Sequence, residues 1–273
     1  FALLAGEREG ELLGRVLDGD CVLTLALYDA QVNPTQWVAG GAIADVVLAR
    51  CGDGVAIYEF DSAERGEENL AGTPLAELDL SGGGRLLGEG AGALKVIAQA
   101  VEEWKLLVAA ALSGLSRDAL RQGAEYACER EAFGQPIGTY QGISHPLADL
   151  ITDVDGGKYY TWKTIHDIAG GAENAGAQIS LALWWVARTA AQSVAQSLHT
   201  FGGYGLSTEY DIHLYNLRAK DWPLVYGDTE LLLEEAGRRL YGGEEAALPE
   251  VGQVAIDFDL GDEARALAEE LDT

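Results

Sequence analysis

A change in the spacing of apolar residues constrains the fold of this chain more than any other feature. From about residue 93, apolar side chains recur every three or four positions, which is the repeat of an amphipathic helix. Only short segments that contain glycine or proline interrupt this repeat before about residue 240. Helices of such length with short connections form an antiparallel four-helix bundle. The predicted helices lie at about residues 93–130, 140–168, 175–201 and 210–240.

The residues before the bundle follow a different pattern. Five short apolar or β-branched runs, bounded by Gly, Asp or Pro, predict a small β-sheet or barrel domain over residues 19–92. Segment 81–93 is rich in glycine but lacks the GK[ST] ending of a phosphate-binding P-loop, so it is predicted to be a hinge or loop. The expected fold class is therefore α+β, with a β domain followed by a helical bundle. The five runs lie at residues 21–30, 36–40, 44–50, 54–60 and 76–80.

The two ends of the chain fit neither pattern. Residues 1–18 have apolar positions three and four apart, which predicts the end of a helix from an N-terminal helical domain that is largely missing. Residues 244–273 begin as an acidic linker with Pro249 and end as an amphipathic helix. This segment is predicted to be separate from the bundle (93–243), either as a C-terminal extension or as the start of a second module.

Charge and cysteine content narrow the functional class. The 273 residues include 44 acidic and 18 basic residues, which gives a formal net charge of −26 at pH 7. A field of this sign repels nucleic acid and anionic membranes, so neither is an expected partner. The three cysteines have no CxxC spacing, which is typical of a reducing compartment. Because no apolar run approaches the roughly 20 residues of a membrane span and no signal-peptide pattern is present, the expected location is the cytoplasm.

The segment from His199 to Glu230 joins two predicted helices through a cluster of glycines. Gly202, Gly203 and Gly205 remove three β-carbons within four positions, which lets the backbone bend and approach a flat or phosphorylated ligand. An ordinary turn between helices uses the same residues. The flanking motifs decide between the two interpretations.

Three separated motifs together resemble the acyl-CoA dehydrogenase family of flavoproteins. The first is WVAGGAIAD at residues 37–45, where Trp37 matches a tryptophan that packs on the isoalloxazine ring in that family. The second is REAFGQPI at residues 130–137, followed by Gln141. The third is FGGYG at residues 201–205. Their order, on the expected types of element, identifies the chain as a member of this family.

The resemblance implies an FAD-binding protein in which two turns contact the cofactor of a neighbouring subunit. Arg130 and Phe133 would contact FAD from one turn, and Gly202 and Gly203 from the other. A guanidinium is a planar, permanently charged partner for a pyrophosphate, although an arginine at this position could also cap a helix. The other cofactor-binding residues that the resemblance implies are Trp37, Gln141, His199 and Thr229.

The family's reaction desaturates an acyl-CoA thioester. A carboxylate base removes the α-proton while a hydride passes to the flavin. The resemblance therefore implies an acyl-CoA substrate, a homodimer, tetramer or heteromeric assembly, and an electron-transfer flavoprotein as partner. No metal site is expected, because His145 and Asp149 share a helix face but have no third ligand.

The position of the catalytic base is where this sequence departs from the family. Most members carry the glutamate of a Tyr-Glu-Gly-Thr turn, but the turn here is VYGDT at residues 225–229, with Gly227 in its place. Asp228, one position on, is the candidate base, and a displacement of about 1 Å can cost about 100-fold in rate. A minority of the family, the isovaleryl type, supplies the base from the start of the first long C-terminal helix, just before an arginine, and the matching positions here are Trp104 and Lys105. Two acids are nearby, but successive helix residues are about 100° apart, so neither replaces residue 104. These acids are Glu102 and Glu103.

Three alternatives remain at this stage. Asp228 is a working base, as in a side branch of the family that oxidises nitroalkanes. Alternatively, the module is non-catalytic and lends Arg130 and the glycine turn to a flavin bound mainly by a partner or by a second fused half. The third alternative is that residues are missing from this sequence, because it contains no methionine at all. Residues that are adjacent here would then be separated in the natural chain, and the motif spacings at the turn would shift.

Overall fold

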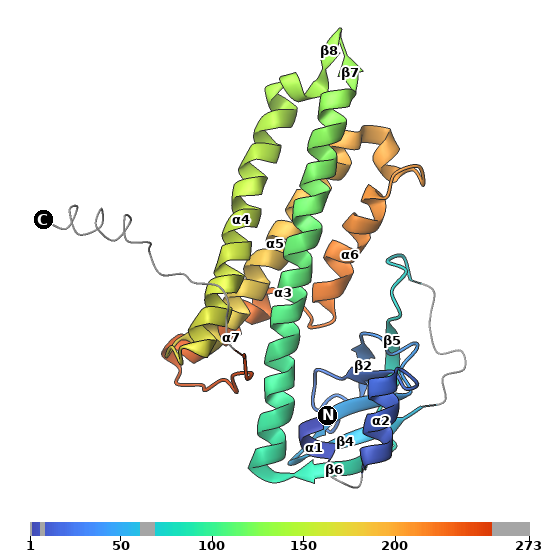
Figure 1. The fold of residues 1–273 in the computed structure, drawn as a ribbon, viewed down its shortest axis with the longest axis vertical. Helices are drawn as coiled ribbons and strands as arrows, with labels where there is room; N and C mark the ends of the chain where they lie inside the picture. The colour runs from blue at the N-terminus through green and yellow to red at the C-terminus, as the bar shows by residue number, and fades with distance from the viewer. Residues whose placement is uncertain (1, 6–8, 61–68, 253–273) are drawn as a thin grey trace, which may run out of the picture.

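The protein consists of a β domain and a helical bundle (Figure 1), which confirms the predicted α+β class. The computed structural model describes residues 2–5, 9–60 and 69–252. The chain begins with the short helices α1 (Ala2–Ala5) and α2 (Gly10–Asp18), which pack beside the β domain. The bundle is built from α3 (Gly90–Glu129), α4 (Gln141–Ala169), α5 (Ala175–Phe201), α6 (Ile212–Leu224) and α7 (Glu230–Tyr241).

The β domain contains a four-stranded sheet and a two-stranded sheet. The four-stranded sheet has the order β1-β3-β4-β6, in which β1 runs parallel to β3 and the other pairs are antiparallel. The smaller sheet pairs β2 with β5. The strands are β1 (Leu23–Leu25), β2 (Thr35–Val38), β3 (Val46–Cys51), β4 (Gly54–Glu59), β5 (Ala76–Asp79) and β6 (Arg85–Glu89).

Strand β3 is a continuous run of apolar residues because both of its faces are buried. Val47 and Ala49 pack toward β2 and β5, whereas Val46 and Leu48 pack toward α2 and the start of α3. Because both faces of the sheet are covered, successive residues are buried and the usual alternation of apolar and polar residues is lost. The sheet thereby anchors the first turns of α3.

Segment 81–93 is not the hinge or loop that its glycine content predicted. It contains strand β6 and the first residues of α3. A β-carbon on Gly84 would lie 2.8 Å from the ring of Tyr58, so this glycine allows close approach of two strands. Glycine at this position serves close packing rather than flexibility, which is why the segment is ordered as a strand.

The three long helices lie within a few residues of their predicted ranges. Helix α3 runs away from the β domain, α4 returns, and α5 runs in the direction of α3 (Figure 1). The main core of the bundle includes Leu112, Leu183 and Val194, each with no exposed area. This arrangement brings the C-terminal ends of α3 and α5 to the same end of the bundle, far from the β domain.

The fourth predicted helix, 210–240, is instead two helices. Helix α6 ends at Leu224, just after Pro223, and α7 begins at Glu230. Gly227 between them has φ +104°, a left-handed conformation that a helix cannot contain. The break places the VYGDT turn beside the β domain, where the Tyr28 hydroxyl donates a hydrogen bond to the carbonyl of Tyr226.

A small hairpin joins α3 to α4 at the far end of the bundle. Its strands are β7 (Glu131–Ala132) and β8 (Gln135–Pro136), and the 3₁₀ helix η2 (Ile137–Thr139) follows. Phe133 at its tip has φ +54° and is 96% exposed. A non-glycine residue in this conformation is uncommon.

The segment after α7 was predicted to be a linker separate from the bundle, but its first residues pack against the bundle. The side-chain amide of Gln99 donates to the carbonyl of Leu248 at 2.8 Å. Leu248 and Val251 pack against an apolar cluster that contains Ile168 and Ile179. The amphipathic helix predicted further on lies outside the described residues, and the second module stays a prediction.

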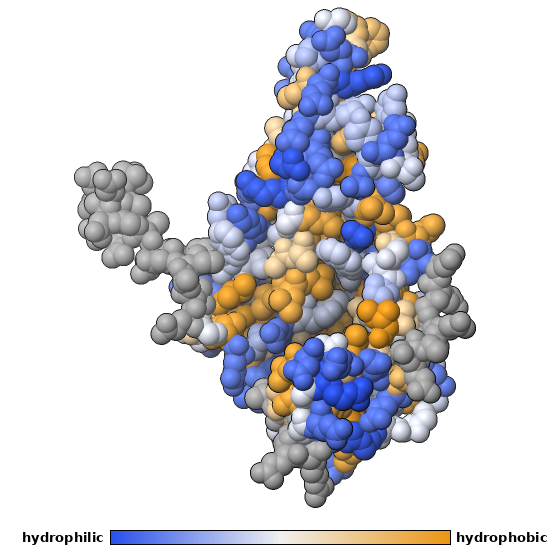
Figure 2. All heavy atoms as spheres, turned by 45° about the vertical axis from the view of Figure 1, so that its right-hand side comes forward, coloured by the Kyte–Doolittle hydropathy of each residue, from blue (hydrophilic) through white to orange (hydrophobic). Residues whose placement is uncertain are grey.

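The described part of the chain contains no helix that is long and apolar enough to span a bilayer. On the face shown in Figure 2, hydrophobic side chains gather where the bundle meets the β domain, and the front of the β domain is mostly hydrophilic. Large apolar side chains also remain exposed beside the VYGDT turn, namely Leu224 at 62% and Leu231 at 44%.

Candidate functional site

A groove at the far end of the bundle contains residues from both predicted cofactor-binding turns. It has a volume of about 520 Å³ and lies between the end of α3 and the turn after α5. Arg130 comes from the first turn, and Gly202 and Gly203 come from the second. The rings of Tyr126 and Phe201, which also line the groove, stack with centroids 4.3 Å apart and join the two helices. The other lining residues are Ile137, Thr200, Tyr204, Ser207 and Glu209.

Arg130 presents a cation that the rest of the described chain leaves unpaired. Its backbone caps the end of α3 in an extended conformation, with its N–H bonded to the carbonyl of Tyr126 at 2.9 Å. Among the residues that the structure describes, its guanidinium has no ion pair, including none with Glu209. Arg117 and Arg121 on the same helix are each paired with acids. In a chain of net charge −26, an unpaired guanidinium in a groove suits a phosphate group.

Two of the three clustered glycines open this groove, and the third serves packing. Gly202 has φ +60°, and a β-carbon on Gly202 or Gly203 would meet no atom within 4 Å. A side chain at either position would project into open space, so the glycines leave room for a ligand against the backbone. Gly205 differs, because its β-carbon would lie 2.6 Å from the carbonyl oxygen of Leu198.

Three further predicted residues lie on elements at the same end of the bundle but do not line the groove. Phe133 is at the hairpin tip, with its ring edge-on to Tyr140 at 6.4 Å between centroids. Gln141 begins α4 and is exposed. His199 is exposed on the last turn of α5, just before the glycine turn. All three are exposed, and none of them lines the groove.

Two predicted cofactor residues lie elsewhere. Trp37 is in β2 of the β domain and is 45% exposed. Thr229 directly precedes α7. The structure does not bring either residue into the groove of Arg130.

The VYGDT turn packs against a smaller cavity between the β domain and the bundle. This cavity has a volume of about 280 Å³. The ring of Tyr226 stacks between those of Tyr28 and Trp104, with centroids 6.2 Å away in each case. Three aromatic rings therefore occupy the space around the turn.

Gly227, which was predicted to stand at the position of the family's glutamate, has a conformation that favours glycine. Its φ of +104° is strained for any residue with a side chain. A β-carbon there would lie 3.3 Å from the Tyr28 hydroxyl oxygen and 3.4 Å from a methyl carbon of Leu231. The backbone and its neighbours thus disfavour any side-chain base at this position.

Asp228, the candidate base, is exposed and interacts with the start of α7. Its Oδ1 accepts a hydrogen bond from the backbone N–H of Glu230 at 3.0 Å. This interaction satisfies one of the backbone donors that the first turn of a helix leaves free. The carboxylate therefore has a structural role that needs no substrate.

Four buried charges beneath the turn were not predicted from the sequence. Lys105 has no exposed area, and its Nζ lies 2.9 Å from Glu102 and 2.7 Å from Glu235. Arg239 binds the same two carboxylates at 2.7 and 2.9 Å. The two cations and two anions join α3 to α7. Their spacing, three residues apart in α3 and four apart in α7, is the signal that could have identified the pairs.

These contacts make the buried carboxylate of Glu235 a poor base. Burial raises the pKa of Glu235, but the charges of Lys105 and Arg239 and the hydrogen bonds from Lys105 and Ser180 hold it below its ordinary value. Burial and the charge of Glu235 raise the pKa of Tyr226 far above its ordinary value, so this phenol stays neutral. A carboxylate with a lowered pKa accepts a substrate proton less readily.

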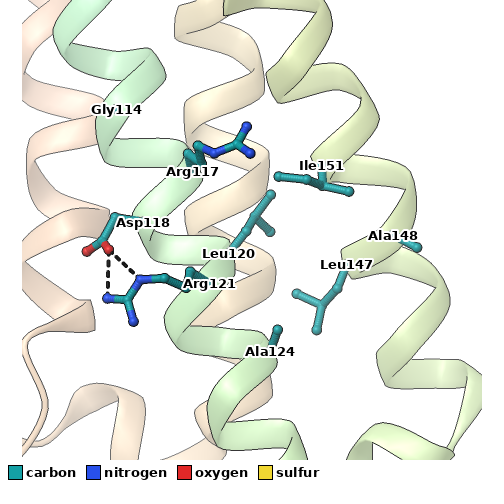
Figure 3. Close-up of a pocket in the computed structure, with 9 residues that line it drawn as sticks. All are labelled: Gly114, Arg117, Asp118, Leu120, Arg121, Ala124, Leu147, Ala148 and Ile151. Carbon is teal, nitrogen blue, oxygen red and sulfur yellow. Dashed lines mark hydrogen bonds and ion pairs between the residues drawn. The ribbon is translucent and has the colours of Figure 1, made fainter.

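A second groove, between α3 and α4, lacks a free charged group. Leu120, Leu147 and Ile151 point into it from the two helices (Figure 3), and its volume is about 580 Å³. Arg121 at its edge is ion-paired with Asp118, as the dashed lines show. Nothing comparable to the unpaired guanidinium of Arg130 orients a ligand here. Within the described ranges, moreover, no three His, Cys, Asp or Glu side chains are placed to hold a metal ion.

Comparison with known protein families matches the bundle to one family model. The model for the acyl-CoA dehydrogenase C-terminal domain covers residues 91–241. The acyl-CoA dehydrogenase FadE27 of Mycobacterium tuberculosis (strain ATCC 25618 / H37Rv) is 30% identical over 261 residues. That match covers 82% of this chain and 68% of the relative.

Solved structures of similar fold include a steroid ACAD variant and a complex of two proteins. A variant of the Tcur3481-Tcur3483 steroid ACAD has a TM-score of 0.73 and 25% identity, and the match covers 89% of this chain and 74% of that one. The ChsE4-ChsE5 complex from Mycobacterium tuberculosis has a TM-score of 0.65 and 25% identity, with 83% of this chain and 68% of that chain covered.

Proposed function

Because the chain belongs to the acyl-CoA dehydrogenase family, we propose that it is a non-catalytic module that helps to hold FAD at a contact with a partner. The partner is a second subunit or a fused second half, which supplies the catalytic base. The observation that carries this proposal is the left-handed backbone of Gly227, which disfavours a side chain at the position of the family's glutamate.

The groove of Arg130 supports the binding part of this proposal. Its unpaired guanidinium would contact the pyrophosphate of FAD, and the backbone at Gly202 and Gly203 would lie against the cofactor. Phe133, Gln141 and His199 are exposed at the same end of the bundle and would complete the contact from outside the groove. When bound, FAD accepts the hydride in the family's reaction.

The similar structures support an assembly of unlike components. One of them is titled as a complex of ChsE4 and ChsE5, and another is named a steroid ACAD. An acyl-CoA is therefore the proposed substrate of the assembled enzyme, with fatty and steroid acyl groups as candidates. An electron-transfer flavoprotein is the proposed electron acceptor.

Reduction of the flavin by acyl-CoA thioesters, measured at saturating FAD, tests the proposal. The purified chain is incubated anaerobically with FAD and with acyl-CoA thioesters from butyryl-CoA to palmitoyl-CoA, and loss of the flavin's visible absorbance is recorded. We expect no loss above that seen with free FAD. Reduction of the bound flavin by any of these thioesters contradicts the non-catalytic assignment.

The second candidate function is an active dehydrogenase that uses Asp228. Its exposed position one residue from Gly227, with Oδ2 free of hydrogen bonds to other described residues, favours this alternative. The variant Asp228→Asn keeps the acceptor for the N–H of Glu230 but removes the base. Turnover that is present in the native chain and absent in this variant supports the second candidate.

A further inference from the structure

The segment that follows helix α7 turns back and lies against the bundle. Helix α7 ends at Tyr241, and Gly243 with φ +70° reverses the direction of the chain. The residues after this turn, 244–252, form neither a helix nor a strand. This segment, the strap, lies at the end of the bundle opposite the β7–β8 hairpin (Figure 1).

The strap packs its apolar residues against the bundle and leaves its acids exposed. Pro249 is buried, and Leu248 and Val251 contact the apolar cluster that contains Ile168 and Ile179. Burial of this apolar area holds the strap on the bundle. The exposed acids of the strap are Glu244, Glu245 and Glu250.

Two specific contacts fix the strap to α3 and α5. The side-chain amide of Gln99 in α3 donates to the carbonyl of Leu248 at 2.8 Å. Ala246 lies over Gly176 in the first turn of α5, and a β-carbon on Gly176 would be only 2.4 Å from the β-carbon of Ala246. Gly176 is buried, and the lack of a side chain there allows this close approach. The strap therefore bridges the two helices.

The positions that the strap contacts lie beside the four buried charges of α3 and α7. Gln99 is one helical turn before Glu102. The carbonyl of Gly176 accepts a hydrogen bond from the guanidinium of Arg239 at 2.8 Å. The side chains of the four charged residues are at most 10% exposed. The strap thus lies at the end of this cluster that faces the start of α5.

The exclusion of water strengthens the ion pairs of this cluster, because charges attract one another more strongly in a medium of low dielectric constant. Lys105 and Arg239 each contact both Glu102 and Glu235, and these ion pairs join α7 to α3. Water that entered the cluster would weaken them and would loosen α7. The VYGDT turn directly precedes α7, so it would loosen with the helix.

We propose that the strap is a conformational device that keeps the charge cluster free of water, and that its release loosens α7 and the VYGDT turn. A change that lifts residues 246–251 from the bundle acts on the turn through α7, without contacting the turn itself. This local opening is distinct from unfolding of the whole bundle. It also does not depend on the groove of Arg130, which lies at the other end of the bundle.

Amide hydrogen exchange, followed by mass spectrometry on the full chain, tests this coupling. The variant Gly176→Ala favours the helix but places its β-carbon against Ala246, so it should displace the strap. We expect exchange in residues 225–241 to become at least about 10-fold faster. Ala246→Gly removes the opposing β-carbon. The double variant Gly176→Ala/Ala246→Gly should therefore restore the exchange rate of the native chain.

The matched control is Gly114→Ala, which makes the same change within α3 where no atom lies within 4 Å of the new β-carbon, and which should leave exchange unchanged. Leu248→Ser releases the strap by a second route, because it removes an apolar contact with the bundle. Unchanged exchange in residues 225–241 of both Gly176→Ala and Leu248→Ser contradicts the proposal. So does a double variant that does not recover, or exchange that becomes equally fast in residues 120–130, since that would indicate a general loss of stability.

Discussion

Arg130 at the end of α3 and Gly203 in the turn after α5 line the same groove, although two interhelical connections separate them in the sequence. Helix α4 runs antiparallel between α3 and α5, so the ends of these two helices meet. The unpaired guanidinium and the open backbone together form a site suited to a phosphate-bearing ligand.

Replacing Gly203 with valine should block the groove without unfolding the protein. No atom lies within 4 Å of a β-carbon at this position, and its φ is outside the left-handed range, so we expect a change in unfolding free energy of about 1 kcal/mol or less. The new methyl groups would occupy the space proposed for FAD. Flavin fluorescence titration should show binding weakened by about 10-fold or more. Unchanged FAD affinity in a folded Gly203→Val protein would exclude the groove as the site.

Removing the buried cation Lys105 should destabilise the protein strongly. Lys105→Met leaves Glu102 and Glu235 with fewer positive partners in a buried environment, and we expect a loss of about 3–5 kcal/mol. Lys163→Met is the control, since Lys163 is itself exposed and its ion pair with Asp167, four residues on in the same helix, is worth about 0.5 kcal/mol or less. Urea denaturation measures both. Equal, small effects would mean that the buried charges contribute little to stability.

The buried carboxylate of Glu235 should make stability depend on acid pH. Its pKa in the folded state is lowered from the ordinary value of 4.5 by the charges of Lys105 and Arg239, so its contribution to stability is complete above pH 4.5 and is lost as the pH falls through the folded pKa. The difference in unfolding free energy between the native chain and Glu235→Gln should therefore be largest near neutral pH and shrink below about pH 4.5. Glu234→Gln provides the same change in charge on an exposed neighbour. A difference that grows toward acid pH would contradict the assigned direction.

The hydroxyl of Tyr28 should hold the VYGDT turn against the β domain. Tyr28→Phe removes the hydrogen bond to the carbonyl of Tyr226 and should cost about 1 kcal/mol. Amide hydrogen exchange in residues 225–229 should also become faster. Tyr241→Phe is the matched control, because Tyr241 is 89% exposed. If both variants exchange alike, the contact does not restrain the turn.

The sequence was most informative where a regular repeat decided the structure. The 3.6-residue period placed α3, α4 and α5 within a few residues, because each helix buries a long apolar face. The split between α6 and α7 was missed, since the effect of Pro223 and Gly227 depends on the dihedral angles that packing against Tyr28 imposes. Strand β6 was missed because the glycines in and around it resemble those of a loop.

The groove of Arg130 could be predicted from the sequence, whereas the surroundings of the VYGDT turn could not. The Arg130 and glycine motifs could be found because each is local, and their proximity follows from the up-down-up order of the helices. The charges of Lys105 and Arg239 were not predicted to be buried, because charged residues are usually exposed and only the tertiary structure brings α3 and α7 together. The left-handed conformation of Gly227 likewise could not be predicted from the sequence.

The central claim is that the groove of Arg130 binds FAD, and a flavin fluorescence titration tests it most directly. Arg117→Gln is the matched control, because it removes the same charge from an exposed position on the same helix. The account predicts saturable binding by the native chain and by Arg117→Gln, and a dissociation constant at least about 10-fold higher for Arg130→Gln. No saturable binding by the native chain, or equal affinity in all three proteins, would contradict it.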